Sequence, residues 1–414
     1  MHPIQEEIHD YIDRLRSFSK NSTVFLLSYS LVTISRGIFT VIFNLYILEL
    51  GFSTTFLGVL ISSHLIGTAL FLFPGGAISD KIGRKKTLVT AVSIMVGSIF
   101  ILSTFQDKSV LLLANGVRGV SFSLLRVTVG PFMMEQSKKY ERMHLFSVNA
   151  SIRSFSSMFG NIIGGFLPGI FAVLLVNSLA VQYQYTLVSA GVFTLIAIFP
   201  LLFIKEKRIA VKPAVKSKPL FSGKRPFVAK FALCSIIIGF GAGVIVPYFN
   251  VYFSQSLGAT SGQIGLIFSA GAFSMGIASL ILPLLVRKFG RVNSTVITHF
   301  LSIPFLLLIM VATSIYSAFI GYFLRTTLMN VSHPAQRNFY MDHIAEHERA
   351  KANSISRFGS TLFRALGSDV GGFLISEGSF SDAFKITAVI YVVGTILFFV
   401  FFRTQDQYHH PEPP

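Results

Sequence analysis

Charge, cysteine and tryptophan are all scarce in this chain of 414 residues. Only 13% of the residues are charged, against about 25% in a typical soluble domain, and 52% are hydrophobic. The single cysteine, Cys234, excludes an intrachain disulfide framework and has no neighbours at metal-ligand spacing. Tryptophan is absent, so Tyr and Phe must serve as interfacial anchors. This composition excludes an ordinary soluble protein, and we expect neither a metal nor a cofactor.

Long apolar runs are what the chain has instead. Runs long enough to cross roughly 30 Å of hydrocarbon as a helix recur from residue 22 to residue 403. We therefore expect an all-α integral membrane protein with twelve transmembrane helices. The expected spans are 24–48, 54–79, 87–105, 109–134, 144–174, 183–204, 228–254, 261–286, 293–314, 316–341, 353–376 and 382–402.

Lysine and arginine are distributed unevenly over the segments that join these spans. With the N-terminus inside, the inner segments hold 25 of them, and the outer segments hold only Lys108 and Lys385. Basic residues favour the cytoplasmic side, so we expect a multi-pass plasma-membrane protein with both termini in the cytoplasm. The basic residues that give the net charge of +17 then lie mainly at the cytoplasmic surface of the membrane, and no nucleic-acid partner is expected.

The chain is expected to have five parts. Isoleucines at helical spacing (Ile4, Ile8, Ile12) predict an amphipathic cytoplasmic segment over residues 1–21. Residues 22–204 and 227–403 form two six-helix bundles, residues 205–226 a basic cytoplasmic linker, and residues 404–414 a cytoplasmic tail.

The two predicted bundles are repeats of one another. A shift of 207 residues superposes Gly58 on Gly265, Arg118 on Arg325 and Gly164-Gly165 on Gly371-Gly372. At a shift of 206, F-N-L-Y (43–46) matches F-N-V-Y (249–252). Such duplication suits a transporter whose halves rock around a site between them.

The first inner hairpin, G-G-A-I-S-D-K-I-G-R-K-K-T-L (75–88), resembles the loop signature of the major facilitator superfamily (MFS). The matching positions are Gly76, Asp80, Gly83, Arg84 and Lys85. The resemblance implies the MFS fold, secondary transport by alternating access, and a cytoplasmic gate. In that gate Asp80 is expected near Asn353, and Glu135 is expected to pair with Arg84. In the second half Arg287 stands where Asp80 stands in the first, which argues against a second, symmetric latch.

Two further segments resemble family elements. Arg118 in the fourth span matches an arginine of proton-coupled members, and G-N-I-I-G-G (160–165) resembles an antiporter element with Asn161 in place of proline. Small residues also let helices pack closely, so both interpretations stay open for the glycines. The expected packing positions are Gly160, Gly164, Gly165, Gly371 and Gly372.

Arginines inside the spans are the strongest functional signal. A charge at mid-membrane costs about 2.5–3.5 kcal/mol, so it should face water or a partner. Lys230, Arg126, Arg153 and Arg357 lie nearer the inner interface, and the resemblance implies that spans 1, 4, 7 and 10 line a central cavity. The predicted substrate pathway contains Arg36, Asn44, Tyr46, Arg118, Asn250, Tyr252, Arg325 and Arg364.

A cavity rich in arginine and poor in carboxylates favours an anionic or zwitterionic solute, because guanidinium binds carboxylate and phosphate in a bidentate manner. The alternative is a proton-driven efflux antiporter for drugs or metabolites, and a membrane sensor is a third possibility. His64 and Asp369 are the candidates for carrying the coupled proton. No phosphate-binding loop or catalytic constellation occurs in the sequence, so neither an ATP-driven pump nor an enzyme is expected. We expect a monomer in the lipid bilayer.

Overall fold

The computed structural model describes residues 18–138, 140–175, 178–205 and 225–405, and these residues form helices and short connections. In chain order the helices are α2 (Lys20–Glu49), α3 (Thr54–Leu70), α4 (Leu72–Ile82), α5 (Arg84–Thr104), α6 (Lys108–Glu135), α7 (Arg142–Leu175), α8 (Leu179–Leu202), α9 (Arg225–Ile245), η1 (Val246–Tyr248), α10 (Phe249–Leu257), α11 (Ser261–Phe289), α12 (Arg291–Met310), α13 (Ile315–Val331), α14 (His333–Asp342), η2 (Glu346–Glu348), α15 (Arg349–Ser376) and α16 (Phe380–Phe402). Most of the predicted amphipathic segment, linker and tail lie outside the described residues.

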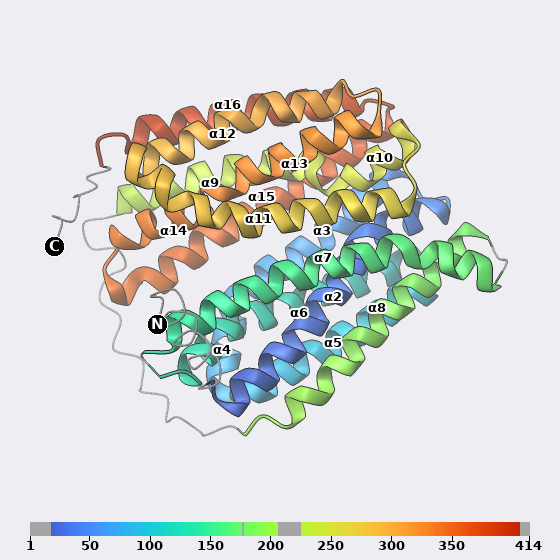
Figure 1. Cartoon of the computed structure of the whole chain (residues 1–414), viewed down its shortest axis with the longest axis horizontal. Helices are drawn as coiled ribbons and strands as arrows, with labels where there is room; N and C mark the ends of the chain where they lie inside the picture. Colours follow the sequence, from blue (N-terminus) through green and yellow to red (C-terminus); the bar gives the residue numbers. More distant parts are fainter. Residues whose placement is uncertain (1–17, 139, 176–177, 206–224, 406–414) are drawn as a thin grey trace, which may run out of the picture.

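Each predicted span corresponds to one helix or to consecutive helices. Three spans are broken: α3 and α4 bend by 51° at Phe71, η1 separates α9 from α10 at Pro247, and Ser332 separates α13 from α14. Within the described ranges, nine helical segments are long and apolar enough to cross a membrane, or ten if α3 and α4 form one span. The shorter α13 and the arginine-bearing α15 lie alongside the other helices of the second half of the chain (Figure 1).

The helices form two bundles, α2–α8 and α9–α16 (Figure 1). The bundles meet mainly through α3 against α15 and α7 against α11. Large apolar side chains such as Val173 (81% exposed) and Leu113 (71% exposed) point outward, as expected for a surface that faces lipid. The structure thus confirms an all-helical membrane protein with two pseudo-symmetric bundles.

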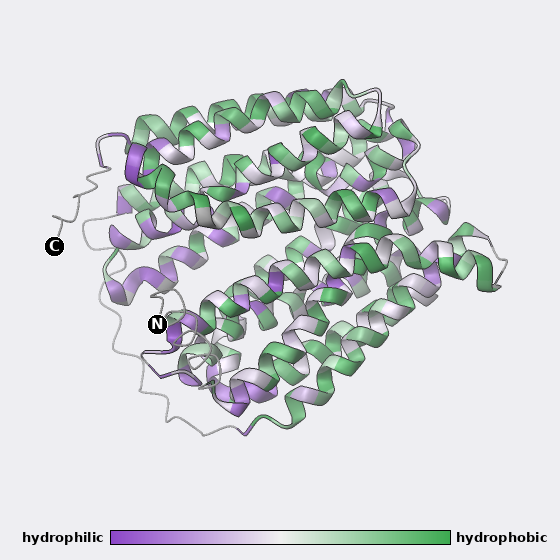
Figure 2. Ribbon diagram, viewed as in Figure 1, coloured by the Kyte–Doolittle hydropathy of each residue, from purple (hydrophilic) through white to green (hydrophobic). Residues whose placement is uncertain are grey.

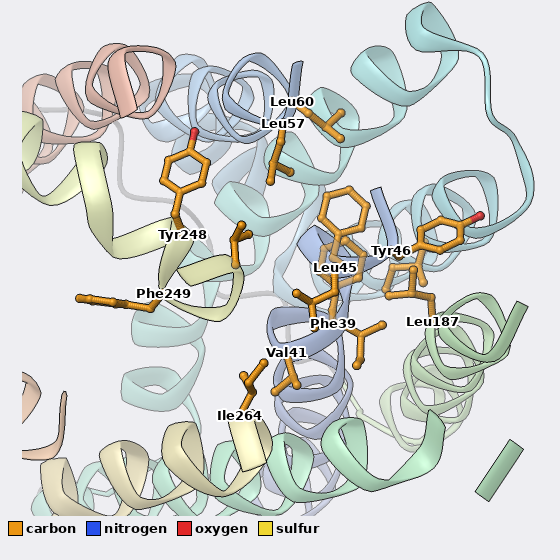
Figure 3. Close-up of a cluster of buried hydrophobic side chains, with 14 of the residues drawn as sticks. Phe39, Val41, Leu45, Tyr46, Leu57, Leu60, Leu187, Tyr248, Phe249 and Ile264 are labelled. Atoms are coloured by element: carbon orange, nitrogen blue, oxygen red, sulfur yellow. The ribbon is translucent and has the colours of Figure 1, made fainter. Parts of the chain in front are cut away.

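The two ends of the molecule differ in polarity. We call the end at which α2 begins and α16 ends the terminal end, and the opposite end the far end. Figure 2 shows that hydrophilic residues gather at the terminal end, whereas the helix bodies are predominantly hydrophobic. Buried apolar side chains of both bundles form one large cluster, in which Val41 and Leu57 lie with Tyr248 and Ile264 (Figure 3).

Paired glycines let the bundles approach closely. A Cβ on Gly165 of α7 would lie 3.0 Å from Cα of Gly265 on α11, and a Cβ on Gly372 of α15 would lie 2.9 Å from Cα of Gly58 on α3. A shift of 207 residues relates the two contacts. The internal repeat is therefore visible as two equivalent helix crossings, in each of which a side chain would overlap the opposite backbone.

The remaining predicted packing glycines act inside the bundles. Gly160 and Gly164 face the backbone of α2, where a Cβ on Gly164 would lie 2.7 Å from Cα of Ile38. Gly371 faces the backbone of α9 at Val244. Five glycines of α7 and α15 thus lie against neighbouring helices, some within a bundle and some between the bundles.

Candidate functional site

Two asparagines connect the bundles on the far-end side. The Asn44 side-chain amide on α2 donates to the Pro247 carbonyl at 2.7 Å and to Asn250 Oδ1 at 3.0 Å. The Asn250 amide on α10 donates in return to the Val41 carbonyl at 3.0 Å. Both side chains are buried, so their hydrogen bonds replace water that each would otherwise bind. The asparagines of the repeated F-N-x-Y segments therefore hold the far end closed.

The tyrosines of the same two segments point elsewhere. The Tyr46 hydroxyl donates to the Ser103 carbonyl of α5 at 3.0 Å, and the Tyr252 hydroxyl donates to the Ile309 carbonyl of α12 at 2.6 Å. Each hydrogen bond stays inside one bundle, and both rings are buried. We expected both tyrosines in the substrate pathway, whereas in the structure each hydroxyl forms a hydrogen bond within its own bundle.

Arg118 lies near the middle of α6 and is half-buried. Its guanidinium carbon stands 3.8 Å from the ring centroid of Phe39, which is a close cation–π contact. Its Nε donates to Asn115 Oδ1 at 2.9 Å, and the Asn115 amide donates to the Leu60 carbonyl at 2.6 Å. Among the described residues only Nε of Arg118 donates a hydrogen bond, so its two terminal nitrogens are available to a ligand.

Arg325 occupies the equivalent position in α13 but a different environment. It is only 4% exposed, and Nη2 donates to the Tyr391 hydroxyl at 2.7 Å. Its Nε is buried and has no hydrogen-bond partner within the part of the chain that the structure describes. Both arginines were expected in the substrate pathway, and in the structure Arg118 is more exposed than Arg325.

Arg36 lies at mid-depth, in the space between the two bundles. It is exposed although it sits in the middle of α2 between the buried Ser35 and Gly37. Its guanidinium lies 5.0 Å from the ring centroid of Phe122 on α6 and within electrostatic range of Arg364 on α15. An exposed side chain that faces the other bundle at this depth requires solvent-accessible space between them.

That space continues toward the terminal end and is lined with further arginines from both bundles. Arg126 on α6 and Arg153 on α7 are exposed and lie within electrostatic range of Arg36. Across the space, Arg357 on α15 lies within range of both. We call Arg36, Arg118, Arg126, Arg153, Arg357 and Arg364 the arginine cluster.

This cluster has no carboxylate ion-pair partner among the residues that the structure describes. In the described ranges, none of its six members forms an ion pair, and the described ion pairs lie at the two ends of the molecule. Uncompensated cations in a space of restricted solvation attract anions. The site is therefore electropositive and lies beside the aromatic rings of Phe39 and Phe122.

The two candidate proton carriers differ in their surroundings. His64 on α3 lies 5.8 Å from the Phe122 ring and within range of Arg36 and Arg118, so a protonated imidazole would face two like charges. Asp369 on α15 lies instead at the contact between the bundles, where its Oδ1 is 2.6 Å from the Ser62 hydroxyl of α3. His64 therefore lies beside cations, whereas Asp369 lies beside a hydroxyl group.

The signature hairpin at the terminal end is held within its own bundle. Gly83, with φ of 96°, forms the turn between α4 and α5 that an L-residue rarely adopts. Arg84 pairs with Asp80 at 2.6 Å and, as expected, with Glu135 at 3.0 Å, while the Lys85 ammonium donates to the Leu202 carbonyl at 2.7 Å. Gly76 borders open space.

The expected contact of Asp80 with Asn353 is not made in this conformation, because Asp80 pairs with Arg84 and Asn353 accepts from Arg357 at 3.1 Å. The second bundle repeats part of the hairpin. Arg291 pairs with Asp342 at 2.5 Å, and a shift of 207 relates this pair to Arg84 and Glu135. The ion pair is thus symmetric, although the Asp80 position is not.

Several residues of the site escaped the sequence analysis. Asn115 orients Arg118, and its spacing of three residues on one helix face was a usable signal. Ser62 and Tyr391 gave no comparable signal, since a single hydroxyl in an apolar helix is common. Their partners, Asp369 and Arg325, lie far away in sequence.

Comparisons with known proteins agree with this architecture. The family model described as Major Facilitator Superfamily matches residues 25–230 and 231–414. The chain is 21% identical over 380 residues to the quinolone resistance protein NorA of Staphylococcus aureus, covering 90% of this chain and 93% of that protein. It is 28% identical over 267 residues to the multi-drug resistance efflux pump PmrA of Streptococcus pneumoniae, covering 62% of this chain and 63% of that protein.

Solved structures show the same fold at low sequence identity. The nucleoside transporter NupG superposes with a TM-score of 0.74 at 13% identity, over 94% of this chain and 100% of that one. A bacterial homologue of the human lysosomal transporter Spinster, in an inward-facing and occupied conformation, superposes with a TM-score of 0.76 at 13% identity, over 94% of this chain and 98% of that one.

Proposed function

The chain belongs to the Major Facilitator Superfamily, and from this premise we propose that it exports amphipathic organic anions or zwitterions by alternating access. Membership makes it a membrane transporter of small molecules rather than an enzyme. What the proposal adds is the chemical class of the substrate, the direction of transport and the coupling ion.

The arginine cluster carries the proposal for the substrate. A carboxylate or phosphate in the space between the bundles meets cations from both sides, and the terminal nitrogens of Arg118 offer the paired donors that such groups bind best. The rings of Phe39 and Phe122 beside the arginines supply an apolar surface for the rest of the molecule. An anionic head with an aromatic or aliphatic body fits both features.

The comparisons bear on the direction of transport. NorA and PmrA, by their names, confer quinolone resistance and drug efflux respectively. They favour the alternative of drug or metabolite export over uptake. No phosphate-binding loop is present in the sequence to hydrolyse ATP, and we propose that a proton gradient drives the export.

Orientation follows from the basic residues. Lysines and arginines concentrate in the segments at the terminal end, which the positive-inside rule assigns to the cytoplasm. The far end is closed by Asn44 and Asn250, while Arg126 and Arg153 are exposed toward the terminal end. With this orientation, we propose that the closed far end corresponds to an inward-facing conformation, the state in which an exporter receives its substrate.

The proposal is tested with paired transport probes. Purified protein is reconstituted in proteoliposomes, and the fluxes of an aromatic carboxylate and of a lipophilic cation of similar size are compared under an imposed proton gradient. We expect the carboxylate to move against its gradient and the cation to move at the rate of protein-free vesicles. Transport of the cation alone would overturn the assignment of the substrate class.

A further inference from the structure

The arginine cluster is distributed over two depths of the space between the bundles. At 1.5 Å of rise per residue, the distance in sequence from the terminal end of each helix gives the depth of each Cα atom. The deep level lies about 22–26 Å along its helices and the shallow level about 12–17 Å. The deep level consists of Arg36, Arg118 and Arg364, and the shallow level of Arg126, Arg153 and Arg357. Each level contains arginines of both bundles.

Electrostatic interactions connect the arginines within each level and between the levels. The three arginines of the shallow level lie within electrostatic range of one another. In the deep level, Arg118 and Arg364 each lie within range of Arg36. Arg36 also lies within range of Arg126 and Arg153. The cluster is therefore a continuous column of positive charge that extends from mid-depth toward the terminal end.

Two helices repeat nearly the same spacing of arginines along this column. On α6, Arg118, Phe122 and Arg126 follow one another at intervals of four residues and share one helix face. The two arginines are about 12 Å apart along the helix axis. On α15, Arg357 and Arg364 are seven residues and about 10–11 Å apart, again on one face. Because the side chains of one helix lean in the same direction, the guanidinium groups keep approximately this spacing.

An uncharged surface lies between the two arginines on each of these helices. On α6 it is Phe122, whose ring centroid is 5.0 Å from the guanidinium carbon of Arg36 and 5.8 Å from the His64 ring. An aromatic ring at this point offers apolar contact to the body of a ligand. On α15 the position between the arginines on the same face is Thr361. A ligand that lies along the column thus meets a cation, an uncharged surface and a second cation.

A ligand with one carboxylate would neutralise only part of the column. A carboxylate accepts hydrogen bonds from guanidinium groups at about 2.7–2.9 Å, so it cannot bind two arginines that stand about 12 Å apart on one helix. The other arginines have no ion-pair partner among the described residues and would continue to repel one another. A second acidic group on the same molecule would bind them without the entropic cost of a second association.

We propose that the arginine cluster binds an organic dianion whose two acidic groups lie about 10–12 Å apart on an aromatic or aliphatic body. One acidic group binds at the deep level beside Arg118, and the other binds at the shallow level between Arg126 and Arg357. The body of the molecule lies over Phe122. This inference rests on the proposed transport of organic anions, and it narrows the substrate class from any amphipathic anion or zwitterion to an elongated dianion.

Three aromatic acids test this spacing in calorimetric titrations of the purified full-length protein. Biphenyl-4,4′-dicarboxylate carries two carboxylates at opposite ends of two linked rings, a separation close to that of the two levels. Biphenyl-4-carboxylate has the same rings and one carboxylate. Benzene-1,2-dicarboxylate has the same charge as the first acid, but its two carboxylates are on neighbouring carbons. The Kd and the number of molecules bound per protein are measured for each acid.

We expect one molecule of biphenyl-4,4′-dicarboxylate to bind, with a Kd at least about tenfold lower than that of either other acid, because it forms additional charge-assisted hydrogen bonds. Arg126→Gln should raise this Kd about tenfold and leave the Kd of biphenyl-4-carboxylate nearly unchanged. Arg126→Lys should recover part of the loss, since it keeps the charge. Arg287→Gln removes an exposed arginine at the end of α11, outside the cluster, and as the matched control should change neither Kd.

Arg357→Gln repeats the test from the second bundle if Arg126→Gln disturbs folding, and it should have the same effect. Equal Kd values for the biphenyl dicarboxylate and the monocarboxylate, or a preference for the dicarboxylate that persists in both variants, would overturn the proposal. Binding of two monocarboxylate molecules with no preference for the dicarboxylate would show two independent anion sites and would overturn it as well. In each of these cases the binding of carboxylates would still support the proposed export of organic anions. If none of the three acids bound, the proposed substrate class would fail together with this inference.

Discussion

Arg118 lies over the ring of Phe39, with its guanidinium carbon 3.8 Å from the ring centroid. The contact joins α6 to α2 inside the first bundle and leaves the terminal nitrogens of the guanidinium free of protein hydrogen bonds among the described residues. An arginine held in this way is oriented before a ligand arrives, so a bound anion does not have to order it. The account of substrate binding therefore depends first on Arg118.

Replacing Arg118 should weaken the binding of an anionic substrate. A charge-assisted hydrogen bond contributes about 1.5–3 kcal/mol, so Arg118→Ala should raise the KM for an aromatic carboxylate about tenfold or more. Arg118→Lys should recover part of the loss, because it keeps the charge but not the paired donors. The KM is measured in proteoliposomes. Lys385→Ala at the far-end surface serves as the control, and an equal loss in that variant would contradict the prediction.

Removing the asparagine contact should open the far end. Asn250→Ala loses the hydrogen bonds to Asn44 and Val41 and leaves buried partners unsatisfied, at a cost of about 1–3 kcal/mol. In the Cys234→Ser background, a cysteine placed at the exposed Thr40 of α2 should then react faster with an impermeant maleimide added from outside the cell.

Tyr46→Phe is the matched control for this experiment, because it removes a hydrogen bond within one bundle. It should leave the labelling rate unchanged. An equal increase in both variants would show that Asn250 does not act specifically on the contact between the bundles.

A methyl group at either glycine crossing should block closure of the far end. The Cβ of Gly372→Ala would lie 2.5 Å from the Thr54 carbonyl oxygen and 2.9 Å from Cα of Gly58. Backbone atoms at these distances cannot yield without separating the helices. Transport should fall by about tenfold or more while the protein still elutes as a single species. Gly169→Ala on α7, which borders open space, should transport normally.

Exchanging the charges of Arg84 and Glu135 should restore the thermal stability that each single substitution removes. Arg84 is largely buried and pairs with Glu135 across α5 and α6. Asp80 also pairs with Arg84, so the comparison is made in an Asp80→Asn background. There, Arg84→Glu and Glu135→Arg each place like charges together, whereas the double variant restores opposite charges. Thermal stability should therefore be lower in each single variant than in the double one. Additive losses in the double variant would exclude a direct contribution of this pair.

The sequence predicted the architecture well because periodic and repeated features encode it. Apolar length located the spans, and the shift of 207 residues identified as repeats the glycines that the structure pairs across the bundles, Gly58 with Gly372 and Gly165 with Gly265. The roles of single polar residues were harder to predict. Asn44 and Tyr46 stand two residues apart on one helix, yet one faces the other bundle and the other faces α5. The direction in which each of these side chains points depends on how the two bundles pack against each other.

The sequence also did not predict that Arg118 and Arg325 differ in exposure and in their partners. Both arginines occupy equivalent positions in the repeat, but their neighbours differ. Phe39 supports Arg118 from the side, whereas Tyr391 accepts a hydrogen bond from Arg325, which is almost fully buried. Such partners come from helices that are distant in the chain, and they are visible only after the bundles have folded.

The most direct test of an arginine-lined binding site is ligand-induced thermal stabilisation of the purified protein. Binding to the folded state alone raises stability by about 2.7 kcal/mol at a ligand concentration of 100 Kd. Across a panel of aromatic carboxylates, lipophilic cations and neutral sugars, we predict a higher Tm with a carboxylate and loss of that increase in Arg118→Ala. Stabilisation by lipophilic cations alone, retained in Arg118→Ala, would contradict the account.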